Sequence, residues 1–240
     1  DNKRYIAVCD IWQKDIIEIA DGIEKAYRVP LGRCHHILGT YPISIIKVRD
    51  IDLPSACKIF QRINQSGKRL DRFDLISAMT FNPDFDLRER LKQDIIASLK
   101  KKAFGEISPS IVTQLMALVK KGACTERVEY SLTSEEIISM WDSVVNSIKL
   151  AADTLRQSVG VQNASFFPYD AILTLLSYFY AKSEKHEISA SELEWVKRWF
   201  WRASFSQHYG SGGATKIGHD KELFDHLING DIPEFEPAMN

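Results

Sequence analysis

The most informative polar residues lie in the segment 60–76, where two helical patterns meet at a polar turn. Asn64 can hydrogen-bond the local backbone, and Gly67 allows a positive φ angle. Lys68 and Arg69 then bring positive charge to the start of the following helix. A turn with these properties could hold an anion such as a phosphate group.

This turn is not a phosphate-binding loop of the Walker A type. In the pattern G-x-x-x-x-G-K-[ST], Arg62 stands where the first Gly belongs, and Arg69 stands where Ser or Thr belongs. A purely structural connection between two helices explains the same residues. The physics of the turn alone favours that alternative.

Arginine and tryptophan alternate on one face of the helix predicted over 190–205. That face holds four residues at the spacing i, i+3, i+4 and i+7: Trp195, Arg198, Trp199 and Arg202. The stripe expected to face the core holds Leu193, Val196, Phe200 and Ala203. Arginine over tryptophan favours cation–π stacking, which is either a packing device or a platform for bases and phosphates. Packing is the simpler interpretation, although the glycine-rich turn at 209–213 favours ligand binding because it can close on a ligand.

Positive charge is concentrated in two segments of a chain whose net charge is −1. Residues 90–127 carry 8 basic and 3 acidic side chains, and residues 195–221 carry 5 and 1. If both segments face the same way in the fold, they would attract a phosphate backbone. The candidate DNA-binding residues are Lys100, Lys101, Lys102, Arg198 and Arg202. Solvated helix faces are the alternative, and they are favoured because lysines at a helix C-terminus complement its macrodipole.

Other kinds of chemistry find no support in the spacing of the residues. The 4 cysteines lie far apart without a C-x-x-C pair, and the 6 histidines show no zinc-finger, HExxH or HNH spacing. We therefore predict no metal site and name no catalytic residue. The longest apolar run, 171–181, includes polar side chains and is too short for a membrane span. Together with the isolated cysteines, it indicates a cytoplasmic protein without a membrane segment.

Most of the chain has helical periodicity. Helices are expected over 12–27, 54–63, 71–80, 85–102, 109–121, 134–158, 168–182, 190–205 and 217–229. The β-branched stretch 41–48 is predicted to form a strand. A lone strand cannot form a stable sheet, so we expect the first segment to be incomplete and the chain to be part of a longer polypeptide. The predicted fold class is α+β, predominantly α, with a domain boundary near residue 82.

Two sequence patterns resemble those of a known family. Residues 56–75 contain F-x-x-I-N-x-x-G-x-x-L, which follows the predicted strand YPISIIKV. Further along, RWFWRASF at 198–205 precedes Tyr-Gly-Ser-Gly at 209–212 and then Asp220. In this order, the patterns are similar to the GmrSD-type restriction endonuclease N-terminal family, the ParB-like NTPases of modification-dependent DNA defence.

The resemblance implies an organisation into two parts. Residues 1–82 would be the C-terminal part of a ParB-like α/β NTPase domain, and residues 83–240 an all-α helical bundle. In the family, the first pattern lies near the nucleotide. The resemblance therefore implies that Phe60, Asn64 and Gly67 are nucleotide-binding residues.

For the intact protein, the resemblance implies an NTP, either GTP or ATP, with Mg as cofactor. It also implies DNA as a partner, modified or not, together with an HNH-type nuclease domain or subunit; a homo-oligomer is a further expectation. The family signature linked to hydrolysis, Asp-Gly-Gln-Gln-Arg, is absent from this chain, and in the family it precedes the part that this chain resembles. No catalytic residue can therefore be transferred, and whether the chain is an enzyme stays open. The alternative is a noncatalytic helical protein-interaction module.

Overall fold

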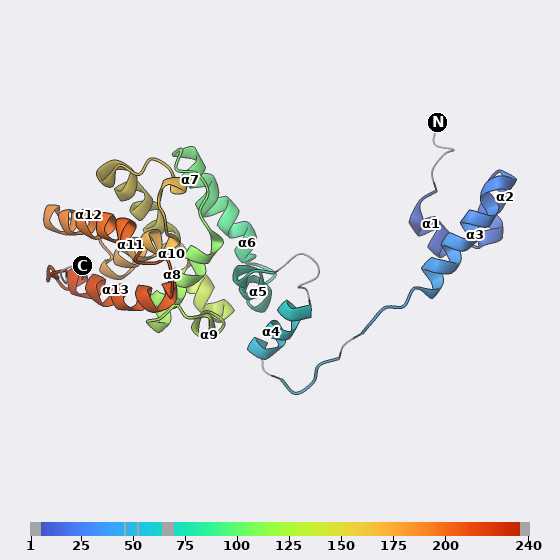
Figure 1. The fold of residues 1–240 in the computed structure, drawn as a ribbon, viewed down its shortest axis with the longest axis horizontal. Helices are drawn as coiled ribbons and strands as arrows, with labels where there is room; N and C mark the ends of the chain where they lie inside the picture. Colours follow the sequence, from blue (N-terminus) through green and yellow to red (C-terminus); the bar gives the residue numbers. More distant parts are fainter. Residues whose placement is uncertain (1–5, 46, 52, 64–69, 236–240) are drawn as a thin grey trace. The chain divides into compact units, whose positions relative to one another are not determined.

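The computed structural model describes residues 6–45, 47–51, 53–63 and 70–235 (Figure 1). Within these ranges the chain is predominantly helical and has no β-strand, apart from an isolated bridge between Asn82 and Phe85. The prediction of a predominantly α protein is confirmed. The predicted ParB-like α/β segment is not found in the described residues.

The chain divides into two compact units, residues 1–50 and residues 51–240. The first unit contains α1 (Val8–Gln13), α2 (Ile16–Asp21) and α3 (Lys25–Thr40). The single helix expected over 12–27 is therefore divided. Asp15 starts a new helix by accepting a hydrogen bond from the backbone N–H of Ile17 at 2.8 Å, and Gly22 ends it.

The first unit buries little apolar surface. Leu31 is the buried hydrophobic residue among its described positions. Large apolar side chains that remain exposed include Val8, Trp12, Ile17, Tyr27, Val29 and Ile37. A unit of this size is stable by itself only if it buries a sufficient apolar core. Its exposed apolar side chains therefore indicate surface that another protein segment would cover.

The strand predicted at 41–48 is wrong for the residues that the structure describes. Residues 41–45 and 47–48 are irregular, and Tyr41, Ile43 and Ile45 are all exposed. The physical reason is that β propensity mostly reflects packing on neighbouring strands, and the described residues offer this stretch no such neighbour.

The second unit is built from helices throughout its described part. In chain order these are α4 (Leu53–Ile63), α5 (Arg72–Met79), α6 (Leu87–Arg90), the π-helix η2 (Leu91–Ile96), α7 (Ala97–Lys101), α8 (Pro109–Lys121), α9 (Glu126–Glu129), α10 (Ser134–Thr154), the π-helix η3 (Leu155–Val159), the 3₁₀-helix η4 (Ala164–Phe166), α11 (Asp170–Ser183), α12 (Ala190–Phe205) and α13 (Gly213–Ile228).

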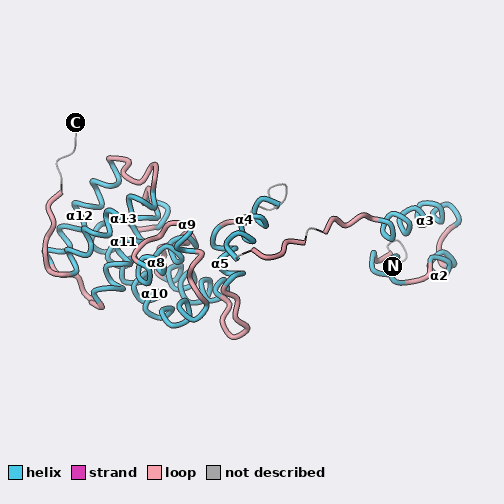
Figure 2. Tube along the Cα trace, turned by 90° about the horizontal axis from the view of Figure 1, so that it is seen from below, coloured by secondary structure: helices cyan, strands magenta, loops and turns pink. Residues whose placement is uncertain are grey.

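Helix α11 lies at the centre of this unit. Every residue from 171 to 180 is buried, and α8, α10 and α13 pack against the helix (Figures 1 and 2). A helix that is apolar on all sides is stable only when protein surrounds it. The apolar run seen in the sequence is therefore the central helix of the core.

Several helix boundaries follow from local capping. Capping boxes form at Thr133/Glu136 and at Ser189/Glu192, at the start of the helices predicted over 134–158 and 190–205. Asp71 begins α5 in the same way, with Asp74 as its partner. Gly122 ends α8 in the left-handed region at φ 78°, where glycine has no steric penalty.

Two expected α-helices contain π-helical segments. The helix predicted over 85–102 is α6, η2 and α7, and the helix predicted over 134–158 is α10 followed by η3. Helical periodicity in a sequence does not distinguish a π turn from an α turn. Single π turns are often found at functional sites, and η2 lines a groove described below.

Helix α5 belongs to the core of the second unit. Phe73, Leu75 and Ile76 are buried there together with residues of α8 and α10. The boundary predicted near residue 82 lies where the sequence pattern changes from a strand-containing segment to helices alone, and as the end of a ParB-like domain it stays a prediction.

A buried ion pair connects α5 to α9. Arg72 Nη1 lies 2.5 Å from Glu129 Oε1, and Thr113 Oγ1 donates to Glu129 Oε2 at 2.8 Å. Glu129 is fully buried. Its burial raises the pKa of Glu129, so folding stability falls as the pH rises from the usual carboxylate range through the raised value.

We predict that Arg72→Met lowers the free energy of unfolding by about 2 to 4 kcal/mol, because it leaves the Glu129 carboxylate buried without a cation. Urea unfolding followed by tryptophan fluorescence measures the change. The matched control is Arg88→Met, whose partner Asp74 sits in a more exposed ion pair, so the expected loss is below about 1 kcal/mol. Equal losses for the two variants would contradict the structural role of the Arg72–Glu129 pair.

Candidate functional site

The predicted nucleotide-binding residues are only partly described. Phe60 lies on α4 and is 55% exposed. Asn64 and Gly67 lie outside the described residues. The nucleotide site therefore stays a prediction.

The structure separates the three lysines of the run 100–102. Lys100 Nζ lies 2.5 Å from Glu106 Oε1, and Lys102 Nζ lies 2.5 Å from Asp153 Oδ2. Lys101 has no carboxylate at ion-pair distance within the described part of the chain. Of the three predicted DNA-binding lysines, Lys101 therefore keeps an uncompensated charge.

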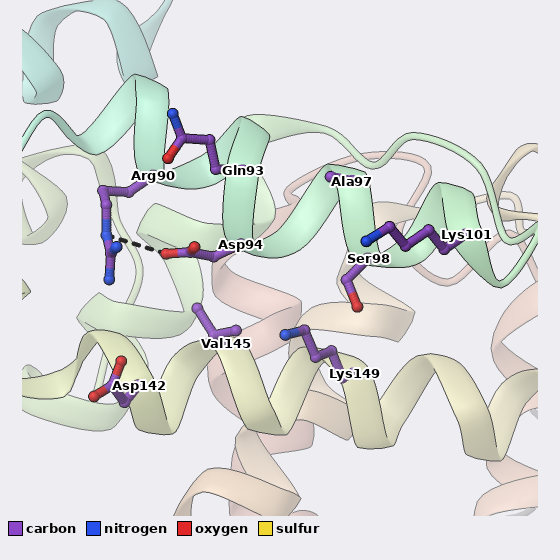
Figure 3. Close-up of a pocket in the computed structure, with 9 residues that line it drawn as sticks. All are labelled: Arg90, Gln93, Asp94, Ala97, Ser98, Lys101, Asp142, Val145 and Lys149. Atoms are coloured by element: carbon purple, nitrogen blue, oxygen red, sulfur yellow. Dashed lines mark ion pairs between the residues drawn. The ribbon is translucent and has the colours of Figure 1, made fainter.

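Lys101 lies in an open groove of about 450 Å³ between η2 and α7 on one side and α10 on the other (Figure 3). The residues that line the groove are Arg90, Gln93, Asp94, Ala97, Ser98, Lys101, Asp142, Val145 and Lys149. In Figure 3, Lys149 extends from α10 into the space between the helices, and Lys101 lies along α7 with its nitrogen near Ser98.

Lys149 is a member of this groove that sequence reasoning missed. It lies on α10, within residues 128–194, which carry 4 basic and 10 acidic side chains. Like Lys101, it has no ion-pair partner among the described residues. Its position on α10, opposite η2 and α7, could have identified it. That pairing of helices is a tertiary feature, which the sequence pattern does not contain.

The other end of the groove holds one cation and two carboxylates. Arg90 Nε lies 3.0 Å from Asp94 Oδ2, and the indole N–H of Trp141 donates to the same oxygen at 2.8 Å. Asp142 also lies at this end in Figure 3. The two unpaired lysines therefore make the opposite end of the groove positive, and an anion would bind there.

Arg198 and Arg202 lie on the solvent side of α12. Their guanidinium carbons are 5.9 and 5.6 Å from the centre of the Phe235 ring. Trp195 and Trp199 are buried on the same helix. The interpretation of these two tryptophans as a platform for bases is thus wrong, and packing is confirmed, because α13 and the following segment cover that side of α12 with Phe224 and Phe235.

A different aromatic pair on α12 is exposed. Trp201 is 49% exposed and Phe205 is 80% exposed, and their rings are stacked at 5.6 Å with an angle of 15°. Trp201 lies with Lys197, Arg198 and Arg202 around a shallow pocket. Exposed flat rings beside cationic side chains are suited to stacking on unpaired bases.

The predicted convergence of the two basic groups is not seen in the pockets. Lys101 lines the groove between α7 and α10, whereas Arg198 and Arg202 line a pocket formed by α12 and Phe235. The two pockets share no residue. We therefore treat them as separate surfaces of the second unit.

A buried carboxylate, Asp220 on α13, organises a third set of polar side chains. Asp220 is 4% exposed. Its Oδ2 accepts hydrogen bonds from the indole N–H of Trp199 at 2.9 Å and from the hydroxyl of Tyr209. Its Oδ1 lies 3.1 Å from His208 Nε2 and 3.4 Å from His219 Nδ1.

Tyr209 acts as a donor in this network. Burial and the neighbouring Asp220 carboxylate raise the pKa of the Tyr209 hydroxyl well above its usual range. The hydroxyl therefore keeps its proton over the whole physiological pH range and donates to Asp220. Sequence reasoning noted Asp220 and the Tyr209 turn within the family pattern, but it did not predict that they meet.

A metal site and a membrane span each place requirements on the described residues. No group of three or more His, Cys, Asp or Glu side chains in this part of the chain is placed to hold a metal ion. None of its helices is both long and apolar enough to cross a bilayer.

The chain is 26% identical to an uncharacterized protein of Methanocaldococcus jannaschii over 93% of its length. It spans about two fifths, 39%, of the length of that relative. No protein-family model matches the chain. No solved structure matches it either.

We predict that Asp220→Ala lowers the free energy of unfolding by roughly 2 to 4 kcal/mol, because two buried donors, on Trp199 and Tyr209, lose their acceptor. The comparison variant is Tyr209→Phe, which removes one donor and leaves the carboxylate, with an expected loss of about 1 kcal/mol. Urea unfolding of both variants measures the difference. A loss for Asp220→Ala no larger than that for Tyr209→Phe would argue against the network.

Proposed function

We propose that residues 51–240 bind nucleic acid through its phosphate backbone. The observation that carries this proposal is the pair of unpaired lysines, Lys101 and Lys149, in one groove. Two like charges held in one groove without a carboxylate partner favour a bound anion. The neighbouring lysines 100 and 102 are neutralised by carboxylates, so the groove, and not the lysine run as such, would be the contact.

The exposed side chains of α12 favour binding of single-stranded nucleic acid. Lys197 and Arg198 provide positive charge beside the stacked rings of Trp201 and Phe205. Cationic side chains follow the backbone, while aromatic rings stack on bases without selecting a sequence. This combination would let the unit hold unpaired nucleotides.

Within this proposal, the chain is part of a cytoplasmic, GmrSD-like DNA defence protein. DNA sensing would then be coupled to NTP hydrolysis in the full-length protein, with Phe60, Asn64 and Gly67 near an NTP and its Mg, and with an HNH-type nuclease domain or subunit as effector. The support is the order of the two sequence patterns at 56–75 and 198–212. The groove does not depend on that resemblance, and its DNA binding can be tested alone.

A helical protein-interaction module is the second candidate. The exposed apolar side chains of the first unit, such as Trp12, Tyr27 and Val29, favour it, because a protein partner that covered them would remove their apolar surface from water. A second copy of this chain is one such partner. The two candidates differ in whether the 240-residue protein binds DNA at low salt.

We predict that Lys101→Met weakens binding to a labelled duplex of about 20 base pairs by several-fold, and that it lowers the slope of log affinity against log salt by about 1. Lys149→Met should have the same effect. Fluorescence anisotropy at several salt concentrations measures both quantities.

The matched control is Lys100→Met, which removes the same charge from the same helix. Because Glu106 already neutralises Lys100, this variant should change the affinity less than Lys101→Met does. Equal effects of the two variants would show that net charge alone governs binding. No binding of any duplex at low salt would favour the protein-interaction module.

We further predict that Phe205→Ala and Trp201→Ala each weaken binding of a short oligothymidylate by about fivefold or more, since stacking on one base contributes about 1 to 3 kcal/mol. Duplex binding should change less, because its bases are already stacked. Phe166→Ala is the control, since Phe166 is also an exposed aromatic but lies on η4. An equal effect of all three variants would count against stacking on α12.

A further inference from the structure

A pocket of about 520 Å³ lies beside the buried carboxylate of Asp220. Its walls come from α12, the turn that follows it, α13, and the segment at 234–235. The volume lies within the range of about 300 to 1,000 Å³ that is usual for small-molecule sites. The pocket shares no residue with the groove that contains Lys101.

One wall of the pocket is cationic or able to become so. Lys216 lies on the first turn of α13 and has no carboxylate at ion-pair distance among the described residues. His208, His219 and Arg202 line the same cavity. The acidic side chains on its lining are Asp220 and Glu234.

Asp220 fixes the orientation of both imidazole rings. His208 directs Nε2 and His219 directs Nδ1 at the same carboxylate oxygen, so the second nitrogen of each ring is not engaged with Asp220. A carboxylate behind an imidazole holds the ring in one orientation and favours a proton on the nitrogen that faces it. The side chain of His208 is partly exposed and that of His219 is mostly exposed, so a ligand can reach both rings.

The histidines are not needed to satisfy the buried part of the network. Trp199 and Tyr209 are both buried, and they donate hydrogen bonds to Asp220 Oδ2 without the histidines. His208 and His219 both face the remaining oxygen, Oδ1, and the unpaired Lys216 lines the same pocket. Packing alone does not require these three polar side chains. The lining also includes the apolar side chains of Leu223 and Phe235.

We propose that this pocket binds a phosphate ester of about nucleotide size. The phosphate group would lie between Lys216, His208 and His219. Lys216 supplies donors to its oxygens, and each imidazole donates from its second nitrogen in the protonated, imidazolium form. The N-terminus of α13, which has no side-chain cap, adds a favourable dipole on the same side. The organic part of the ester would contact Leu223 and the ring of Phe235.

The experiment uses the 240-residue protein and isothermal titration calorimetry with thymidine 5′-monophosphate, thymidine and inorganic phosphate. The monophosphate should bind, and thymidine should not. Lys216→Met and His219→Ala should each weaken monophosphate binding by about tenfold, since each removes a donor to a charged group. Lys120→Met, which removes an exposed lysine at the end of α8, should leave the affinity unchanged.

Absence of heat with the monophosphate, or equal effects of Lys216→Met and Lys120→Met, would overturn the proposal. His219 is an exposed surface residue, so His219→Ala gives a folded test even if Lys216→Met disturbs α13. Lys101→Met should not change monophosphate binding. Failure of this proposal and failure of duplex binding at the groove are therefore distinguishable.

The phosphate ester could come from a free nucleotide or from the end of a nucleic-acid strand. A single strand with a 5′-phosphate and the same strand with a 5′-hydroxyl separate the two sources. A preference for the phosphorylated strand that exceeds the monophosphate affinity, and that Lys216→Met abolishes, assigns the site to a strand end. Monophosphate binding that depends on Lys216, without a preference between strands, assigns it to a free nucleotide.

Discussion

Burial of α11 on every side is the constraint on which the second unit depends. Since α8, α10 and α13 must each turn an apolar face to this helix, their polar faces have little freedom. Helix α10 consequently presents Lys149 toward η2 and α7, away from the core, while α13 presents Asp220 toward α12. The positions of the polar groups are thus consequences of how an apolar helix is covered.

The parts of the fold that could be predicted are those fixed by neighbours in the sequence. The capping boxes at Thr133 and Ser189 and the glycine end of α8 depend on residues within one turn, and helix boundaries predicted at 134, 190 and 121 lie at these caps. The stretch 41–48 shows the opposite case. Its β-branched residues fit a strand, yet a strand needs a partner that the sequence pattern of the stretch itself cannot supply.

The candidate site shows the same division between local and long-range information. The run Lys100–Lys102 suggests three equivalent cations, but Lys102 pairs with Asp153, 51 residues away, and Lys100 pairs with Glu106. Contacts in the folded protein decide which of the three lysines has no carboxylate at ion-pair distance. For the same reason, the Arg–Trp face of α12 was ambiguous in sequence, since its tryptophans are buried only because Phe224 and Phe235 cover them.

The Asp220 network gives a physical reason for the residues in the second sequence pattern. Trp199 and Tyr209 both donate to one buried oxygen, so loss of Asp220 leaves two buried donors unsatisfied, and loss of either donor removes a hydrogen bond from the buried carboxylate. Packing therefore explains the tryptophan, the tyrosine and the aspartate together. It does not explain His208 and His219, whose rings are accessible and share the second oxygen. We therefore expect the histidines and Lys216 to contact a ligand in this pocket, with Asp220 as the group that positions the rings.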